Sequence, residues 1–156
     1  MLQSDYGRTG HTVPGGVDLS TFTPGAARTA TPLLLFPADA AEPRKNVVLF
    51  LEALALIRRS GRPVEAWLAG PGQPPRELSE LAAEGMTAVV RTELLSEAEL
   101  IEAYQRSWVT VLPSRSEVFG LVVLESLACG TPAVVLADVL GPTTIITPST
   151  GVTASE

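Results

Sequence analysis

Short apolar runs alternate with longer amphipathic stretches along most of this chain. The runs are four to six residues long and several end at Gly or Pro, which is typical of buried strands. The stretches between them carry apolar residues at helical spacing. The pattern predicts five strands, at residues 33–36, 64–69, 87–90, 108–112 and 133–136, and four helices, at residues 46–60, 76–84, 96–106 and 120–129.

Regular alternation of apolar strands with helices indicates a parallel sheet that is covered on both faces. We therefore expect an α/β fold with an open, doubly wound (Rossmann-like) parallel sheet. Residues 1–31 are rich in Gly, Thr, Ser and Pro, and we expect them to form a leader and an interdomain linker. Residues 32–156 are expected to form one domain.

The composition is that of a globular domain, because 46% of the 156 residues are hydrophobic and 18% are charged. The net charge of −6 argues against nucleic-acid binding, which needs clustered Lys and Arg. The single cysteine, Cys129, excludes an intrachain disulfide. No run reaches the ~18 apolar residues of a membrane span, and the polar start lacks the apolar core of a signal peptide. We expect a cytoplasmic protein, with association to a membrane surface left open.

Candidate binding residues follow the first and fourth predicted strands. In an open α/β sheet, ligands bind beyond the carboxyl ends of the strands, where the strand order reverses. For the order 3-2-1-4-5, that place lies between the loop with Arg44 and Lys45 and the loop with Glu117, which leads to Glu125. Cations suit phosphates, and carboxylates accept hydrogen bonds from sugar hydroxyls. This predicts a site for a nucleoside diphosphate-sugar, although either cation alone could be a solvated charge at a helix start.

Glu125 is the only charged residue between Glu117 and Asp138, and it lies within an apolar helix. A carboxylate buried without partners costs on the order of a few kcal/mol, so its presence indicates a role. The helix begins near Phe119 and Gly120, where unpaired N–H groups and the positive helix end suit a diphosphate. Gly120 would also let a ligand approach the backbone closely.

The segment at residues 113–132, PSRSEVFGLVVLESLACGTP, closely resembles the donor-site signature of retaining glycosyltransferases of the family-four group, which have the GT-B fold. In that family, two glutamates with seven residues between them hold a nucleotide-sugar. Weaker resemblances extend the match from about His11 to Gly151. The resemblance implies that the chain is the C-terminal, nucleotide-sugar-binding domain of a GT-B fold, truncated at both ends.

The resemblance also implies roles for individual residues. Glu117 would contact the sugar hydroxyls, Glu125 would bind the ribose, and Lys45 would hold the diphosphate. Glu117 and Lys45 are the residues that it assigns to catalysis. The full set of donor-binding residues would be Arg44, Lys45, Gly70, Glu117, Phe119, Gly120, Leu121 and Glu125.

The implied reaction is hexosyl transfer with retention of configuration from a UDP-, GDP- or ADP-linked sugar. No metal and no cofactor are expected, because no metal-ligand cluster is visible and the only histidine, His11, lies in the leader. The acceptor would bind to an N-terminal domain that is missing here. We expect the last strand and the returning helices to lie beyond residue 156, so that the domain is incomplete and the chain alone has little or no turnover.

Three positions depart from the family pattern. Ala40 stands where members supply an arginine, and Leu140 and Thr144 stand where a late loop usually has a glycine and a glutamate. These changes leave open a noncatalytic or degenerate module that binds a nucleotide or a partner protein. A dinucleotide-dependent oxidoreductase is disfavoured, because no Gly-x-Gly-x-x-Gly follows the first strand. A GT-B sugar-nucleotide epimerase is a more distant alternative.

Overall fold

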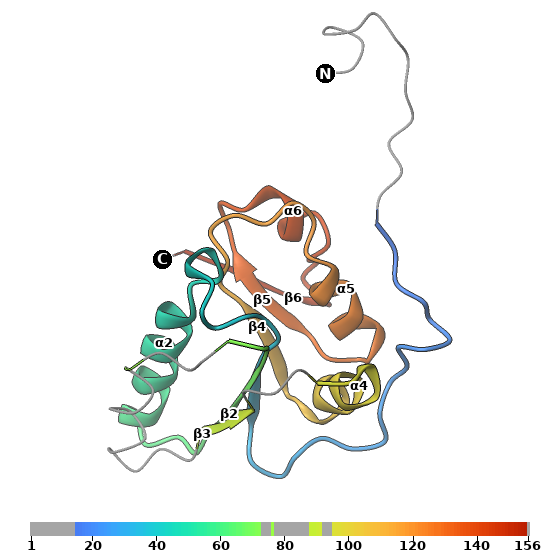
Figure 1. The fold of residues 1–156 in the computed structure, drawn as a ribbon. Coiled ribbons are helices and arrows are strands. Elements are labelled where there is room, and N and C mark those ends of the chain that lie inside the picture. The colour runs from blue at the N-terminus through green and yellow to red at the C-terminus, as the bar shows by residue number, and fades with distance from the viewer. Residues whose placement is uncertain (1–14, 73–75, 77–87, 92–94, 156) are drawn as a thin grey trace, which may run out of the picture.

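The computed structural model describes residues 15–72, 76, 88–91 and 95–155. Within these ranges the chain forms one sheet of six parallel strands in the order β3-β2-β1-β4-β5-β6 (Figure 1). The strands are β1 (Leu33–Phe36), β2 (Glu65–Ala69), β3 (Ala88–Arg91), β4 (Val109–Leu112), β5 (Ala133–Leu136) and β6 (Gly151–Ala154).

Within the described residues, helices lie in the connections from β1 to β2, β3 to β4, β4 to β5 and β5 to β6, as is usual for parallel strands. The described helices are the short 3₁₀-helix η1 (Pro43–Lys45), α2 (Val47–Arg59), α4 (Glu97–Arg106), α5 (Leu121–Ala128) and α6 (Leu140–Thr143). A reciprocal capping box starts α4, in which the Ser96 hydroxyl accepts from the Glu99 amide and the Glu99 carboxylate accepts from the Ser96 amide. The helix predicted at residues 76–84 lies, after its first residue, outside the described residues.

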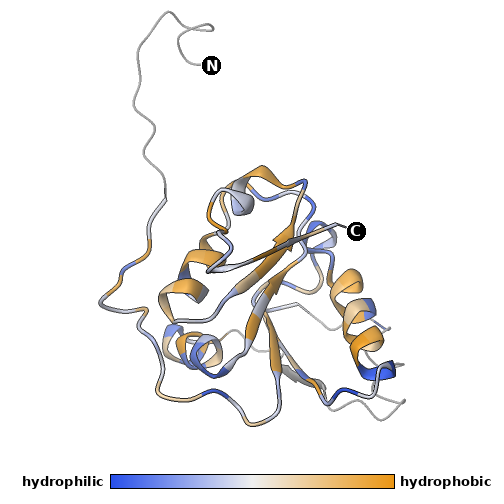
Figure 2. Ribbon diagram, turned by 180° about the vertical axis from the view of Figure 1, so that it is seen from behind, coloured by the Kyte–Doolittle hydropathy of each residue, from blue (hydrophilic) through white to orange (hydrophobic). Residues whose placement is uncertain are grey.

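Helices cover both faces of the sheet, with α2 on one side and α4 and α5 on the other (Figure 1). Side chains of β1 alternate between the two layers: Leu34 and Phe36 pack with α2, whereas Leu35 packs with α4. All four residues of β1 are buried, because this central strand has helices on both faces. The middle of the sheet is accordingly mostly hydrophobic (Figure 2).

The predicted fold class, the five predicted strands and their order are confirmed, with strand ends shifted by at most one residue. A sixth strand that the sequence analysis did not predict, β6 (Gly151–Ala154), extends the sheet beside β5. It is an edge strand with two exposed residues, Val152 and Thr153. Such a strand lacks the apolar run that marks the buried strands.

Candidate functional site

The strand order reverses between β1 and β4, and two loops meet at the carboxyl ends of these strands. The amide of Arg115, after β4, donates to the carbonyl of Arg44 in η1 at 2.9 Å. The Arg44 guanidinium donates in return to the carbonyl of Ser116 at 3.0 Å. These bonds join segments about seventy residues apart in the sequence, at the place where the sequence predicts a binding site.

Lys45 and Glu117 form an ion pair at the centre of this junction. The Lys45 ammonium donates to Oε2 of Glu117 at 2.6 Å, and the two side chains are only 14% and 16% exposed. Lys45 ends η1, and Asn46 then takes a left-handed conformation with φ 56° before α2 begins. Asn tolerates this conformation better than most residues. The single helix predicted from residue 46 is therefore preceded by a separate turn that carries the lysine.

Arg44 reaches the same carboxylate from a more exposed position. Its Nη1 atom lies 3.7 Å from Oε2 of Glu117, and its Nε atom pairs with Glu42. The side chain of Arg44 is 45% exposed, so solvent weakens these ion pairs. Two cations thus converge on Glu117, and Lys45 makes the closer contact.

The amino end of α5 follows Glu117 closely in the sequence, and its backbone turn requires the glycine at position 120. Gly120 has φ +86°, and a Cβ there would lie 3.1 Å from Cγ of Pro142. Leu121, the first residue of the helix, is half exposed. Phe119 packs against the linker, because a Cβ on Gly15 would lie 2.8 Å from its ring. The glycine that was predicted to admit a ligand is therefore also required by the backbone turn.

Gly70 lies at the same edge of the sheet, where it packs closely against the backbone of the loop after β1. It follows β2, and a Cβ on it would lie 2.0 Å from the carbonyl oxygen of Ala38, after β1. A real Cβ cannot approach a backbone oxygen that closely, so only glycine fits there without displacement. Gly70 thus holds two neighbouring loops together, while its predicted contact with a nucleotide stays a prediction.

Glu125 is partly buried, and its partner is Tyr104. The Tyr104 hydroxyl donates to Oε2 of Glu125 at 2.9 Å, from α4 to α5. Burial, followed by the negative charge of Glu125, raises the pKa of Tyr104 well above its ordinary value. The same two causes raise the pKa of Cys129 to about 11, so both groups stay protonated at neutral pH. Oε2 of the Glu125 carboxylate is therefore hydrogen-bonded inside the fold, on the side that faces α4.

Two groups near the site carried no recognisable signal in the sequence. Tyr104 is a fully buried member of the core, and no local pattern reveals its bond to a residue 21 positions away. The Ser114 hydroxyl, just after β4, is buried and has no hydrogen-bond partner within the described residues. An unpaired buried hydroxyl costs about 1–3 kcal/mol, and such groups in native structures call for an explanation.

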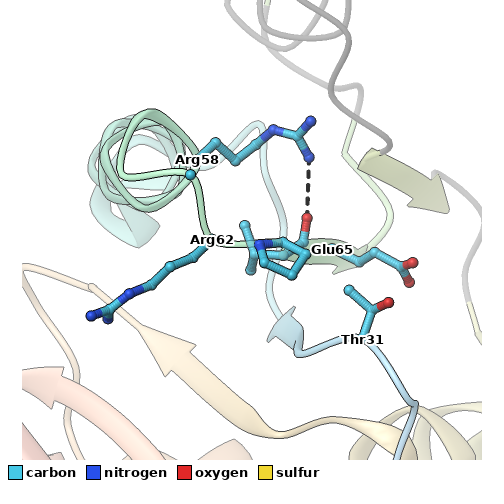
Figure 3. Close-up of a pocket in the computed structure, with 7 residues that line it drawn as sticks. Thr31, Arg58, Arg62 and Glu65 are labelled. Carbon is cyan, nitrogen blue, oxygen red and sulfur yellow. Dashed lines mark hydrogen bonds between the residues drawn. The ribbon is translucent and has the colours of Figure 1, made fainter.

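A hollow of about 430 Å³ lies elsewhere, at the amino ends of β1 and β2 (Figure 3). Arg58, one of its lining residues, donates to the carbonyl of Val64 at 3.2 Å. Arg62 points away from the other labelled side chains (Figure 3). Because ligands of open α/β sheets bind at the carboxyl ends of strands, the cluster around Glu117 is the stronger candidate.

Comparison with known proteins identifies the family of this chain. Residues 31–156 match the protein family described as "Glycosyl transferases group 1". The chain belongs to this family. A relative from Nocardiopsis dassonvillei, named D-inositol 3-phosphate glycosyltransferase, is 40% identical over 168 aligned residues, which cover 94% of this chain and 39% of the relative. A protein of the same name from Thermobifida fusca is 40% identical over 142 residues, covering 79% of this chain and 33% of the relative.

Solved structures of other proteins share the fold. Sucrose-phosphate synthase from Thermosynechococcus elongatus superposes with a TM-score of 0.76 and 26% identity, over 91% of this chain and 38% of that one. The C-terminal domain of LpcC from Francisella tularensis, a glycosyl transferase group 1 protein, gives 0.71 and 19% identity, over 90% and 80%. The resemblance to the C-terminal domain of the GT-B fold is confirmed, and the chain spans about two fifths or less of the curated relatives' length.

The described residues of this glycosyltransferase domain show neither a membrane-spanning helix nor a cluster of metal ligands. None of its helices combines the length and the apolar composition that a membrane crossing requires. Across the same residues, no three His, Cys, Asp or Glu side chains gather into a possible metal site. The structure gives the positions of the predicted site residues, and their contacts with a donor stay predictions.

Proposed function

We propose that this chain is the donor-binding domain of a retaining, metal-independent glycosyltransferase. It would hold a nucleoside diphosphate-sugar, and the sugar would pass to an acceptor bound by a domain outside this chain. The observation that carries the proposal is the contact of Lys45 with Glu117, beside the amino end of α5. A cation, a carboxylate and a helix amino end meet there, and these are the groups that a charged sugar donor needs.

In this proposal the diphosphate lies against the positive groups of the site. Lys45 has three N–H donors, so it can bond to Glu117 and to phosphate oxygens together. Arg44 and the first amides of α5 would add positive charge at the same place. As the bond from sugar to phosphate breaks, negative charge grows on the leaving diphosphate, and these groups would stabilise it. The charge comes from the chain itself, so the proposal needs no divalent metal.

The two glutamates would position the donor. Glu117 would accept hydrogen bonds from sugar hydroxyls and hold the anomeric carbon at a fixed distance from the phosphate cluster. Glu125 would accept from the hydroxyls of the ribose. Neither residue is assigned a proton transfer, because the proposed transfer depends on positioning and on stabilisation of the leaving group.

A second candidate function is a noncatalytic module that binds a nucleotide or a partner protein. Two local observations favour it. Ala40, in the place where family members supply an arginine, is buried and carries no charge. The Thr144 hydroxyl donates to the carbonyl of Gly141 at 2.7 Å, at the end of α6. Binding of nucleoside diphosphates with no preference for a sugar-linked form would favour this module over a transferase domain.

Replacing Glu125 by alanine is expected to weaken binding of a nucleoside diphosphate about tenfold, because hydrogen bonds from the ribose to a charged acceptor are lost. The measurement is calorimetric titration with UDP, GDP and ADP. A Glu125→Gln variant separates ligand binding from folding, since its amide oxygen can still accept from Tyr104. We expect it to retain wild-type stability and part of the affinity. Unchanged affinity in Glu125→Ala would remove Glu125 from the donor site.

A further inference from the structure

Tyr104 is fixed to α5 and to the segment that follows it at two points. Its hydroxyl donates to Glu125 at 2.9 Å, and its backbone carbonyl accepts from the Thr131 hydroxyl at 2.7 Å. Both Tyr104 and Thr131 are buried, with exposed fractions of 0% and 1%. A tyrosine held at its backbone and at its tip has little freedom to move. Tyr104 is therefore a firmly held hydrogen-bond donor for the Glu125 side chain.

The Glu125 carboxylate keeps unused hydrogen-bond acceptor capacity when it is bonded to Tyr104. A carboxylate can accept about four hydrogen bonds through its two oxygens, and Tyr104 donates a single proton to Oε2. Burial and the charge of Glu125 hold the pKa of Tyr104 well above its ordinary value, so the phenol remains a donor at neutral pH. Glu125 can thus keep its bond to Tyr104 and still accept from a pair of neighbouring hydroxyls.

From these contacts we propose that Tyr104 is a positioning residue for ribose recognition, which rests on the proposed function of Glu125. Tyr104 restricts the Glu125 carboxylate to an orientation in which it accepts from the 2′- and 3′-hydroxyls of the nucleotide. A side chain fixed before the ligand arrives loses less conformational entropy on binding. Removing the tyrosine hydroxyl therefore reduces the preference for a ribose over a ribose that lacks these hydroxyls.

The test compares the affinity of the whole chain for two forms of each nucleoside diphosphate, with and without the ribose hydroxyls. UDP, GDP and ADP and their 2′,3′-dideoxy forms are titrated into wild type and into Tyr104→Phe. We expect the affinity ratio of ribo to dideoxy form to fall about fivefold in Tyr104→Phe, since a hydrogen bond contributes about this factor. Affinity for the dideoxy form should change little. Ser107→Ala is the matched control, because it removes a buried hydroxyl from the end of the same helix that bonds to the Ala103 carbonyl.

If Tyr104 had a purely structural role, its substitution would weaken the binding of both forms equally. An unchanged ratio of ribo to dideoxy affinity would therefore overturn the proposal. In a Glu125→Ala background, the tyrosine substitution should leave the ratio unaltered, because the residue acts through the carboxylate. A further fall of the ratio in that background would also overturn it. Absence of binding by the wild type to all three diphosphates would instead reject the proposed function, and this inference with it.

Discussion

Replacing Lys45 by alanine is expected to weaken the affinity for a nucleoside diphosphate about thirtyfold, as measured by calorimetric titration. The reason is that a bond from a charged donor to phosphate contributes about 2 kcal/mol. The effect should depend on the phosphates, so affinity for the free nucleoside should be nearly unchanged. Arg62→Ala is the control, because it removes an exposed cation from the opposite end of the sheet. Equal losses in the two variants would contradict a specific role for Lys45.

The same substitution also removes the closest cation from Glu117. That carboxylate is 16% exposed, and a mostly buried charge that loses its partner destabilises the fold. We expect the free energy of unfolding of Lys45→Ala to fall, and a second change, Glu117→Gln, to restore part of it. The double variant should still bind diphosphates weakly. This pair of variants therefore separates the contribution of Lys45 to folding from its contribution to binding.

Replacing Gly141 by alanine is expected to lower the free energy of unfolding by about 3 kcal/mol, as measured by urea denaturation. A Cβ at this position would lie 2.3 Å from the carbonyl oxygen of Val118 and 2.8 Å from that of Glu117. Backbone atoms cannot yield as a flexible side chain can, so the loop after β4 must move. Because that loop carries Glu117, affinity for a nucleoside diphosphate should fall in the same variant.

Gly16→Ala is the matched control for this prediction. It makes the same chemical change at a glycine where a Cβ would meet nothing within 4 Å and where φ is not positive. We expect its free energy of unfolding to stay within about 0.5 kcal/mol of wild type. If Gly141→Ala were as stable as Gly16→Ala, the close packing of the two loops would be refuted.

The sequence predicted the arrangement of the sheet and that the loops carrying Lys45 and Glu117 lie on either side of one site. Both predictions rest on features that are local or general: apolar strands of regular spacing, and the rule that sites form where strand order reverses. The two loops come together because β1 and β4 are neighbours, and Lys45 then pairs with Glu117. A resemblance concentrated in residues 113–132 indicated a glycosyltransferase family, and the family match confirmed this.

The features that escaped prediction depend on contacts between distant segments. The bond from Tyr104 to Glu125 requires α4 and α5 to pack side by side, which no pattern within either helix reveals. The approach of Gly141 to the Val118 carbonyl is likewise a tertiary contact. Strand β6 escaped for a different reason, because an edge strand with a polar face has no continuous apolar run.

The most direct test of the donor-site proposal is a map of backbone amide shifts by NMR during titration with UDP, GDP and ADP. The proposal predicts that one nucleotide perturbs the amides of Lys45 and of residues 117–121, at the carboxyl ends of β1 and β4. The amides that line the hollow around Arg58 and Glu65 should stay unchanged. Shifts confined to that hollow, or no shifts with any of the three nucleotides, would contradict the proposal.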